Sequence, residues 1–284
     1  MDWLDALQRL RAARAPAVIV TLAMVRGHAP RNGGAKMVVS AEGLFGTVGG
    51  GNLEATAVAR AREMLAAASA EPELLTLTLS DKSTTEYGVQ CCGGEVTMLL
   101  EPVRVVPSVA IFGIGHVGLE LARILARQQI ELHLVDSRAE MLAPERVGVP
   151  REPGMPDTVG AQGAFADAVA DIRMHHLPVP EAGLASLPPG AHVLVMTHDH
   201  VEDLAIVETA LRTEGLGSIG LIGSTAKWAR FQKQLREAGH DDAALARVMT
   251  PIGIAGIRSK DPAAIAVSVA ARVLQLVEQG AAAR

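Results

Sequence analysis

The chain has 284 residues, of which 49% are hydrophobic and 2% aromatic, and its formal net charge is −5 at pH 7. This length allows two ordinary domains. The scarcity of aromatic residues and the absence of a basic stripe argue against nucleic acid as a partner. No apolar run is long enough to predict a membrane span. The two cysteines leave no disulfide framework, so we expect a cytoplasmic protein.

The N-terminal part predicts a small α/β domain that ends before a proline-marked joint. Hydrophobic periodicity predicts two helices, at 2–14 and 52–68, and strands at 17–25, 37–40, 43–48, 74–80 and 95–102. Pro102 and Pro107 bracket a short apolar stretch between the two halves. We therefore expect domains at residues 1–104 and 107–284.

The C-terminal part alternates strands with helices. The stretch "SVAIF" predicts a strand that leads into a glycine turn, a helix and a second strand. Residues 144–190 are harder to assign, although "ADIRMHHLP" favours a short strand. Further strands are expected at 191–198 and 217–224, and helices at 201–214, 225–238 and from Pro262 to about 279. This alternation predicts a doubly wound parallel sheet of the Rossmann type.

The strongest local motif is Gly113-Ile-Gly115-His-Val-Gly118, which follows a strand and opens a helix. In this context Gly113 permits the turn, Gly115 lets a phosphate approach the backbone, and Gly118 lets the helix pack on the sheet. Asp136 ends the next strand, where an acid can accept hydrogen bonds from a ribose hydroxyl. The fold hosts many ligands, so the motif leaves the ligand open.

A second glycine loop, Gly49-Gly50-Gly51, precedes the helix expected at 52–68, which Asn52 can cap. A glycine loop before a helix N-terminus can bind an anion. Arg26, Arg31 and Lys36 lie in or beside the preceding loop and favour that interpretation. The alternative is a turn that serves chain geometry only.

Cys91-Cys92-Gly93-Gly94 follows a polar stretch and precedes a strand. Adjacent cysteines rarely pair, and two thiols without a nearby histidine make a poor zinc site. Two interpretations stay open: small, inert, buried residues, or loop thiols that ligate a soft metal or accept sulfur.

His198-Asp199-His200 follows an expected buried strand, at the end that faces the ligand crevice of a doubly wound sheet. Metal ligation is conceivable, but capping of the next helix combined with ligand contact is favoured. Ser224, after Gly223, can cap another helix and face an anion. The remaining candidates are interpreted as ordinary strand, loop or surface histidines: His133, His175, His176 and His240. No catalytic set emerges, which favours binding over turnover.

Taken together, the motifs resemble the XdhC/CoxI family, the xanthine dehydrogenase accessory proteins, over nearly the whole chain. The resemblance is carried by "GHAPRNGGAKMVV", "GTVGGGNLE", "GVQCCGGEVTMLLEP", "FGIGHVGLELARIL", "VDSR", "MTHDHVEDLAIVETAL", "GLIGSTAKWARF" and "PIGIAGIRSKDPAAIAVSVAA". Thr250 stands where many relatives have cysteine, which puts any third thiol in doubt.

The resemblance implies a homodimeric carrier, not an enzyme, that binds molybdenum cofactor (molybdopterin). Such proteins protect the cofactor while a cysteine desulfurase sulfurates it, and deliver it to apo xanthine dehydrogenase. The two glycine loops would then meet around one cofactor, with one loop on the pterin phosphate. Cys92 would contact the molybdenum, with Cys91 assisting or structural. His116 would contact the ligand, alongside the glycine, Asp136, His198–His200 and Gly223–Ser224 positions named above.

Two alternatives from other function classes remain. Gly113–Gly118 and Asp136 also suit an NAD(P)-dependent oxidoreductase. A nucleotidyltransferase or regulator acting on the same cofactor is disfavoured, because its nucleotide-transfer motifs are missing.

Overall fold

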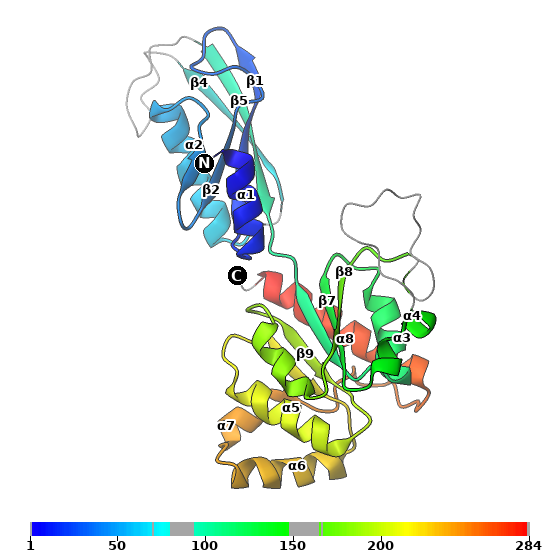
Figure 1. The fold of residues 1–284 in the computed structure, drawn as a ribbon. Helices are drawn as coiled ribbons and strands as arrows, with labels where there is room; N and C mark the ends of the chain where they lie inside the picture. The colour runs from blue at the N-terminus through cyan, green and yellow to red at the C-terminus, as the bar shows by residue number, and fades with distance from the viewer. Residues whose placement is uncertain (1, 70, 80–93, 148–164, 166, 283–284) are drawn as a thin grey trace. The chain divides into compact units, whose positions relative to one another are not determined.

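The computed structural model describes residues 2–69, 71–79, 94–147, 165 and 167–282 (Figure 1). The chain divides into two compact units, one built on the residues up to Val105 and the other on Val106–Gly280. No helix in the described ranges is both long and apolar enough to cross a membrane.

The N-terminal unit is built on a five-stranded antiparallel sheet with the order β3-β2-β1-β5-β4. Alternate side chains of the central strand β1, among them Val18, Val20 and Leu22, are fully buried, as expected for a strand with one face on a core. The strands are β1 (Ala17–Arg26), β2 (Lys36–Ser40), β3 (Leu44–Gly46), β4 (Glu73–Leu79) and β5 (Gly94–Val103).

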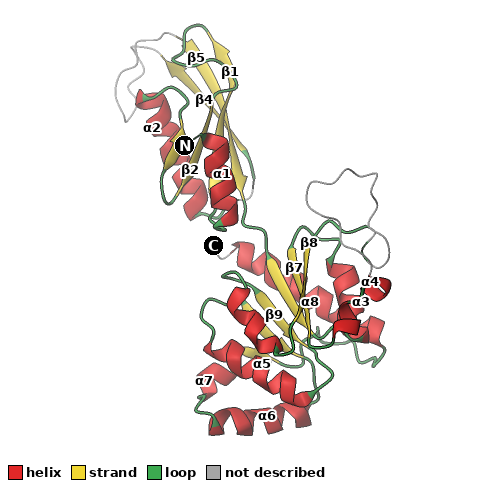
Figure 2. Ribbon diagram, viewed as in Figure 1, coloured by secondary structure: helices red, strands yellow, loops and turns green. Residues whose placement is uncertain are grey.

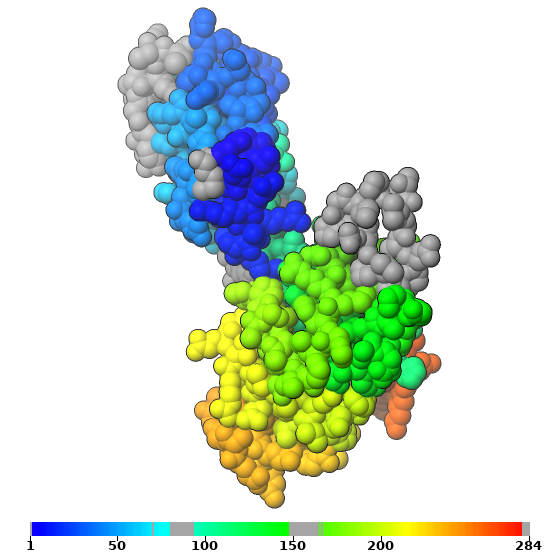
Figure 3. All heavy atoms as spheres, viewed as in Figure 1, coloured from blue at the N-terminus to red at the C-terminus, as the bar shows by residue number. Residues whose placement is uncertain are grey.

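Two helices cover opposite faces of this sheet. Helix α2 (Gly51–Ala66) packs Leu53 and Ala57 into the larger core, which it shares with Val20 and Met98. Helix α1 (Trp3–Ala12) covers part of the other face through Leu10. Figure 3 shows α1, in dark blue, on the surface of this unit.

The C-terminal unit is built on a six-stranded parallel sheet with the order β11-β10-β9-β6-β7-β8. Read from β8, this is the strand order 3-2-1-4-5-6 of dinucleotide-binding folds. The strands are β6 (Ser108–Phe112), β7 (Glu131–Asp136), β8 (Asp171–His176), β9 (His192–Val195), β10 (Ser218–Leu221) and β11 (Val248–Met249).

Helices lie on both faces of this sheet (Figure 2). All five residues of β6 are buried and point alternately into two cores, so Ile111 joins one and Phe112 the other. Helices α3 (His116–Leu125) and α8 (Pro262–Ala282) form the first core with the sheet, and α5 (His200–Arg212) and α6 (Thr225–Glu237) the second. Shorter elements are α4 (Pro144–Val147), α7 (Asp242–Leu245) and the 3-10 turns Ala139–Leu142 and Pro180–Ser186.

The fold class expected from the sequence is confirmed, with local differences. The strand expected at 191–198 ends at Val195, which leaves Thr197 and His198 in the following loop. The cap of α2 was predicted wrongly: Gly50 is the N-cap, with φ of 72°, and Asn52 lies inside the first turn. A positive φ favours glycine over asparagine at the N-cap. The helix therefore begins at Gly51, one residue before the start expected from the sequence.

Candidate ligand-binding site

The candidate site lies in the C-terminal unit, at the carboxyl ends of the parallel strands. Strands β6 and β9 are neighbours there, although the chain runs from each toward opposite edges of the sheet. In an open α/β sheet this switch in strand order creates the crevice in which ligands bind. The loops after β6, β7, β9 and β10 are therefore where site residues are sought.

The three motif glycines have different surroundings. Gly113 has φ of +100°, and a Cβ there would lie 2.5 Å from the Met196 carbonyl oxygen. A Cβ on Gly118 would lie 2.0 Å from the carbonyl oxygen of Gly113, so helix α3 packs directly on the turn. A Cβ on Gly115 would meet no atom within 4 Å. The first two glycines have the geometric roles expected of them, and Gly115 faces open space.

Both carboxylate oxygens of Asp136 already accept hydrogen bonds from the protein. Its Oδ2 accepts a hydrogen bond from the Ile114 amide at 2.7 Å, and Oδ1 accepts from the Arg138 amide and Nε, both at 3.0 Å. Burial alone would raise the pKa of Asp136, but the hydrogen bonds from Arg138 and Ile114 hold that pKa below its ordinary value. The carboxylate fixes the glycine turn, and a ribose hydroxyl would have to displace Arg138 to reach it.

The three predicted site residues His198, Asp199 and His200 have separate partners. Asp199 caps α5, since its Oδ1 accepts from the Val201 amide at 2.6 Å, as predicted. His198 Nδ1 lies 3.8 Å from Glu202 Oε2, and His200 Nδ1 lies 2.8 Å from an Arg230 guanidinium nitrogen. Ser224 caps α6 and accepts from the Lys227 amide. Nowhere in the described ranges do three His, Cys, Asp or Glu side chains form a metal-binding group.

A buried ion pair joins helices α5 and α6, which follow β9 and β10. Asp203 is fully buried, and its carboxylate accepts from the Thr197 amide and hydroxyl at 3.0 and 2.8 Å. Lys227 Nζ pairs with the other carboxylate oxygen and donates to the Ile222 carbonyl at 2.9 Å. Sequence reasoning missed this pair. The sequence did contain an indication of it: the helical spacing puts Asp203 on the same face of the helix as Ile206, Val207 and Ala210, which face the core. A carboxylate on a core face needs a partner.

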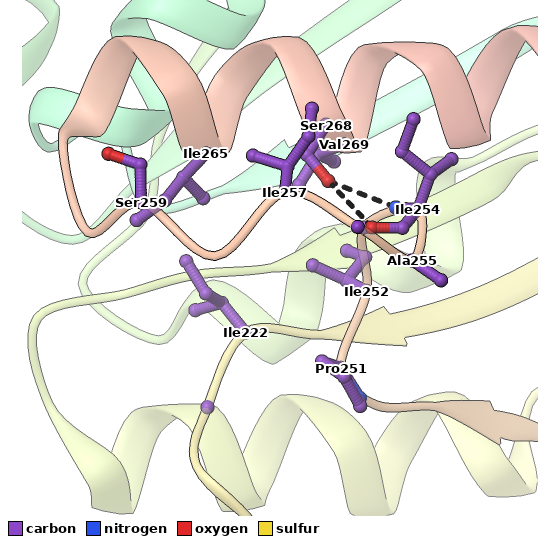
Figure 4. Close-up of a pocket in the computed structure, with 13 residues that line it drawn as sticks. Ile222, Pro251, Ile252, Ile254, Ala255, Ile257, Ser259, Ile265, Ser268 and Val269 are labelled. Carbon is purple, nitrogen blue, oxygen red and sulfur yellow. Dashed lines mark hydrogen bonds between the residues drawn. The ribbon is translucent and has the colours of Figure 1, made fainter.

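An apolar cavity of about 390 Å³, here called the isoleucine cavity, lies between the loop after β10 and helix α8 (Figure 4). The Ser268 hydroxyl on α8 holds the loop at Pro251–Ile257, which forms one wall of the cavity. It accepts from the Ile254 amide at 3.0 Å and lies 3.3 Å from the Ile254 carbonyl oxygen. Its lining residues are Ile222, Gly223, Pro251–Ile257, Ser259, Ile265, Ser268 and Val269.

A second cavity, of about 340 Å³, lies where α3 and α8 begin. We call it the arginine cavity, because Arg123 and Arg146 both line it. The predicted ligand contact His116 is also part of its wall. The other lining residues are Leu119, Glu120, Asp261, Pro262 and Ala263. Arg146 could not have been found from the sequence pattern, because it lies in the stretch that gave no clear element.

The glycine loop of the N-terminal unit is closed by its own side chains. Glu54 Oε2 accepts from the Thr47 hydroxyl at 2.5 Å, the Val48 amide at 3.3 Å and the Gly50 amide at 3.2 Å. The Gly49 amide donates to the Thr47 hydroxyl at 3.1 Å. These amides already have acceptors, which favours the interpretation of this loop as a turn serving chain geometry.

One loop contacts both this turn and the start of β5. A Cβ on Gly49 would lie 2.9 Å from Pro30, and one on Gly94 would lie 2.4 Å from the His28 carbonyl oxygen. Of the three cations expected here, Arg31 lies near Gly49. Arg26 pairs instead with Glu95, and Lys36 with Thr21. Cys91, Cys92 and Gly93 lie outside the described residues.

Two histidines interpreted as ordinary, the buried His133 and the partly exposed His175, form a pair away from the site. His133 is 2% exposed, and its Nδ1 lies 3.1 Å from His175 Nε2 and its Nε2 3.0 Å from Glu131 Oε1. Burial lowers the pKa of His133; His175 and Arg173 add to this effect and Glu131 opposes it. The pattern hid this pair, because alternation cannot show which neighbours a sheet brings together.

Comparison with known families matches both units. Residues 109–273 match the XdhC Rossmann domain, and residues 10–78 match the XdhC and CoxI family. A solved crystal structure of a Bacillus halodurans protein, described as a xanthine dehydrogenase, is similar with a TM-score of 0.45 and a sequence identity of 19%. The alignment covers 98% of this chain and 96% of the Bacillus halodurans chain.

Two Escherichia coli (strain K12) proteins are similar in sequence. YqeB is 27% identical over 271 residues, which are 94% of this chain and 45% of YqeB. The molybdenum cofactor insertion chaperone PaoD is 26% identical over 277 residues, 90% of this chain and 82% of PaoD. The chain thus spans less than half of the length of YqeB. Since the Rossmann-domain match alone covers more than half of the chain, the protein belongs to the XdhC/CoxI family.

Proposed function

We propose that this chain binds molybdenum cofactor as cargo, protects it while a cysteine desulfurase supplies sulfide to the metal, and delivers it to apo xanthine dehydrogenase or a related hydroxylase. The observation that carries the proposal is family membership together with similarity to PaoD, which is itself named as a molybdenum cofactor insertion chaperone. In this proposal the chain has no turnover of its own and works in the cytoplasm as a homodimer.

The carboxyl edge of the C-terminal sheet offers what such a cargo needs. Gly115 has room for a ligand group against the backbone. The isoleucine cavity offers apolar walls for a flat ring system, and the arginine cavity offers cationic side chains. His116 and Gly223 line these cavities, which supports their predicted ligand contacts. The roles of Cys91 and Cys92, and the meeting of the two glycine loops around one ligand, stay predictions.

The NAD(P)-dependent oxidoreductase remains a hypothesis that keeps the strand order and the open Gly115 in its favour. The environment of Asp136 argues against it, because both carboxylate oxygens already accept hydrogen bonds from the protein. A thermal-shift titration separates the two, since a ligand that binds only the folded state raises the unfolding temperature. We expect molybdopterin to stabilise the chain and millimolar NAD to leave it unchanged.

The central experiment is purification of the chain from cells that make the cofactor, followed by molybdenum analysis and fluorescence of the oxidised pterin. We expect about one cofactor per chain and transfer of that cofactor to apo xanthine dehydrogenase. Preparations free of pterin and molybdenum, unable to activate the apoenzyme, would contradict the proposal.

A glycine variant tests whether the cargo lies at the C-terminal edge. Gly115→Ala adds a methyl group into space that is empty in the protein, so the fold is kept. We expect cofactor retention to fall by roughly tenfold or more, because a ligand loses its close approach to the backbone amides. Gly43→Ala, where a Cβ would have its nearest atom at 3.7 Å, is the matched control in the N-terminal unit. Equal retention by both variants would remove Gly115 from the site.

A further inference from the structure

The charges around the arginine cavity are unevenly satisfied. Arg123 pairs with Glu120 one turn earlier on α3. The Asp261 carboxylate accepts from the Ala263 amide at 3.0 Å and so caps α8. Arg146 donates to the Met141 carbonyl at 2.6 Å, and within the described residues no carboxylate lies within ion-pair distance of it. The cavity therefore contains a guanidinium that has no anionic partner among the described residues.

Two further arginines, Arg138 and Arg123, act on Arg146. Arg146 is partly buried, and burial together with Arg138 and Arg123 lowers its pKa, while Asp136 acts in the opposite direction. The Asp136 carboxylate, however, is held by Arg138 and by the Ile114 amide. Like charges in a partly desolvated place are unfavourable unless an anion joins them, and the fork of an arginine matches the oxygens of a phosphate.

The cavity also lies beside backbone groups that favour an anion. His116, the first residue of α3, is in its wall, and its neighbour Gly115 is open to approach. The first amides of a helix point outward and carry the positive end of its dipole. This adds to the field of the two arginines, of which Arg123 lies further along α3 and Arg146 lies on α4.

We propose that the arginine cavity binds the phosphate monoester of the pterin cargo, with Arg146 as its main ligand and Arg123 as its second. The inference rests on the proposed function for the identity of the molecule that carries the phosphate. It chooses between the two glycine loops, because at the N-terminal loop Glu54 already accepts from the Val48 and Gly50 amides and Thr47 from the Gly49 amide.

The test measures binding of inorganic phosphate and of molybdopterin to the full chain by calorimetry and by retained pterin fluorescence. Arg146→Gln is expected to weaken both by about ten- to a hundredfold, the range for a lost charge-assisted hydrogen-bonded contact. Arg146→Lys keeps the charge without the fork and should fall between wild type and Arg146→Gln, and Arg123→Gln should lose less. Arg127→Gln, which removes an exposed guanidinium near the end of α3, is the matched control and should bind like wild type.

The outcomes separate this inference from the proposed function. Equal phosphate affinity in wild type and Arg146→Gln, or no phosphate binding by wild type, overturns the anion site. Pterin retention that is equal in both proteins overturns it while the carrier function stands. Phosphate binding that depends on Arg146, in a wild-type chain that retains no pterin, supports the anion site and contradicts the carrier function. Binding of NADP in place of molybdopterin, lost in Arg146→Gln, overturns the pterin as bearer of the phosphate. Unfolding of each variant without ligand checks that α4 is intact.

Discussion

The two glycine loops look alike in sequence and differ in what accepts their amide hydrogens. In the N-terminal unit Glu54, from the helix that the loop precedes, accepts from Val48 and Gly50. In the C-terminal unit Asp136, from a neighbouring strand, accepts from Ile114 and leaves Gly115 facing open space. In the first loop a carboxylate of the following helix accepts from the loop amides. In the second loop a carboxylate from a neighbouring strand fixes the turn and leaves the Gly115 backbone accessible.

This difference teaches that glycine content reports backbone freedom and does not report ligand binding. A positive φ at Gly50 or Gly113 requires glycine whether or not an anion is bound. What decides the matter is whether the amides have acceptors within the protein, because a buried donor without one is costly. The amides of the first loop have acceptors within the protein, whereas the second loop has room for a ligand at Gly115.

The largest expected effect comes from Gly118. In Gly118→Ala the new Cβ would lie 2.0 Å from the Gly113 carbonyl oxygen, a backbone atom that cannot move without distorting the turn. We expect a loss of about 3 kcal/mol or more in the free energy of unfolding. Gly115→Ala, three residues earlier in the chain, should change it by less than about 0.5 kcal/mol, as surface changes usually do. Denaturant unfolding of both variants measures the contrast, and equal losses would contradict the room for a Cβ at Gly115.

Asp136→Asn is expected to have the next largest effect. The change removes the charge that holds Arg138 and weakens the acceptor for the Ile114 amide, at a cost of about 2 to 3 kcal/mol. The pKa of Asp136 is lowered in the folded protein, so its contribution is present above its ordinary pKa and is lost as the pH falls. The stability difference between wild type and Asp136→Asn should therefore shrink below about pH 5. A difference that stays constant down to acid unfolding would contradict this role.

The parts of the fold that sequence predicted are those that local rules determine. The buried run of β6, the glycine turn and the helix after it follow one another with no need of distant partners. The two caps at Asp199 and Ser224 are equally local. The antiparallel pairing of the N-terminal sheet was not predicted, because short strands give their alternation and not their neighbours.

The parts of the site that sequence missed depend on contacts between distant residues. Asp203 and Lys227 are 24 positions apart and meet only because β9 and β10 are adjacent. Arg146 reaches the beginning of α3 from a four-residue helix that has no periodic signal. Asp136 was identified correctly as the end of its strand, yet its partner Arg138 decides what the carboxylate can bind.

Glu54 offers the converse test at the first loop. Glu54→Ala removes the acceptor for three groups of the chain, and we expect a loss of about 1 to 2 kcal/mol in unfolding free energy. Glu54→Gln keeps one oxygen as an acceptor and should lose less. Neither variant should change the affinity for inorganic phosphate, if the phosphate lies at the arginine cavity. Phosphate affinity that rises in Glu54→Ala would show that the freed amides form a second anion site.

The smallest effect concerns the strand behind the second loop. β7 ends at Asp136 and carries His133, which is buried against Glu131 and His175. Because burial lowers the pKa of His133 in the folded protein, the unfolded chain takes up this proton first as the pH falls below about 6.5. Stability should therefore decline from about pH 7 to pH 5, a window in which ordinary carboxylates stay ionised. His133→Asn, which cannot take up the proton, should flatten this slope in unfolding experiments, and His200→Asn, at an exposed histidine, should not. A slope that is equally steep in His133→Asn would assign the acid sensitivity to other groups and leave β7 as a passive support of the glycine turn.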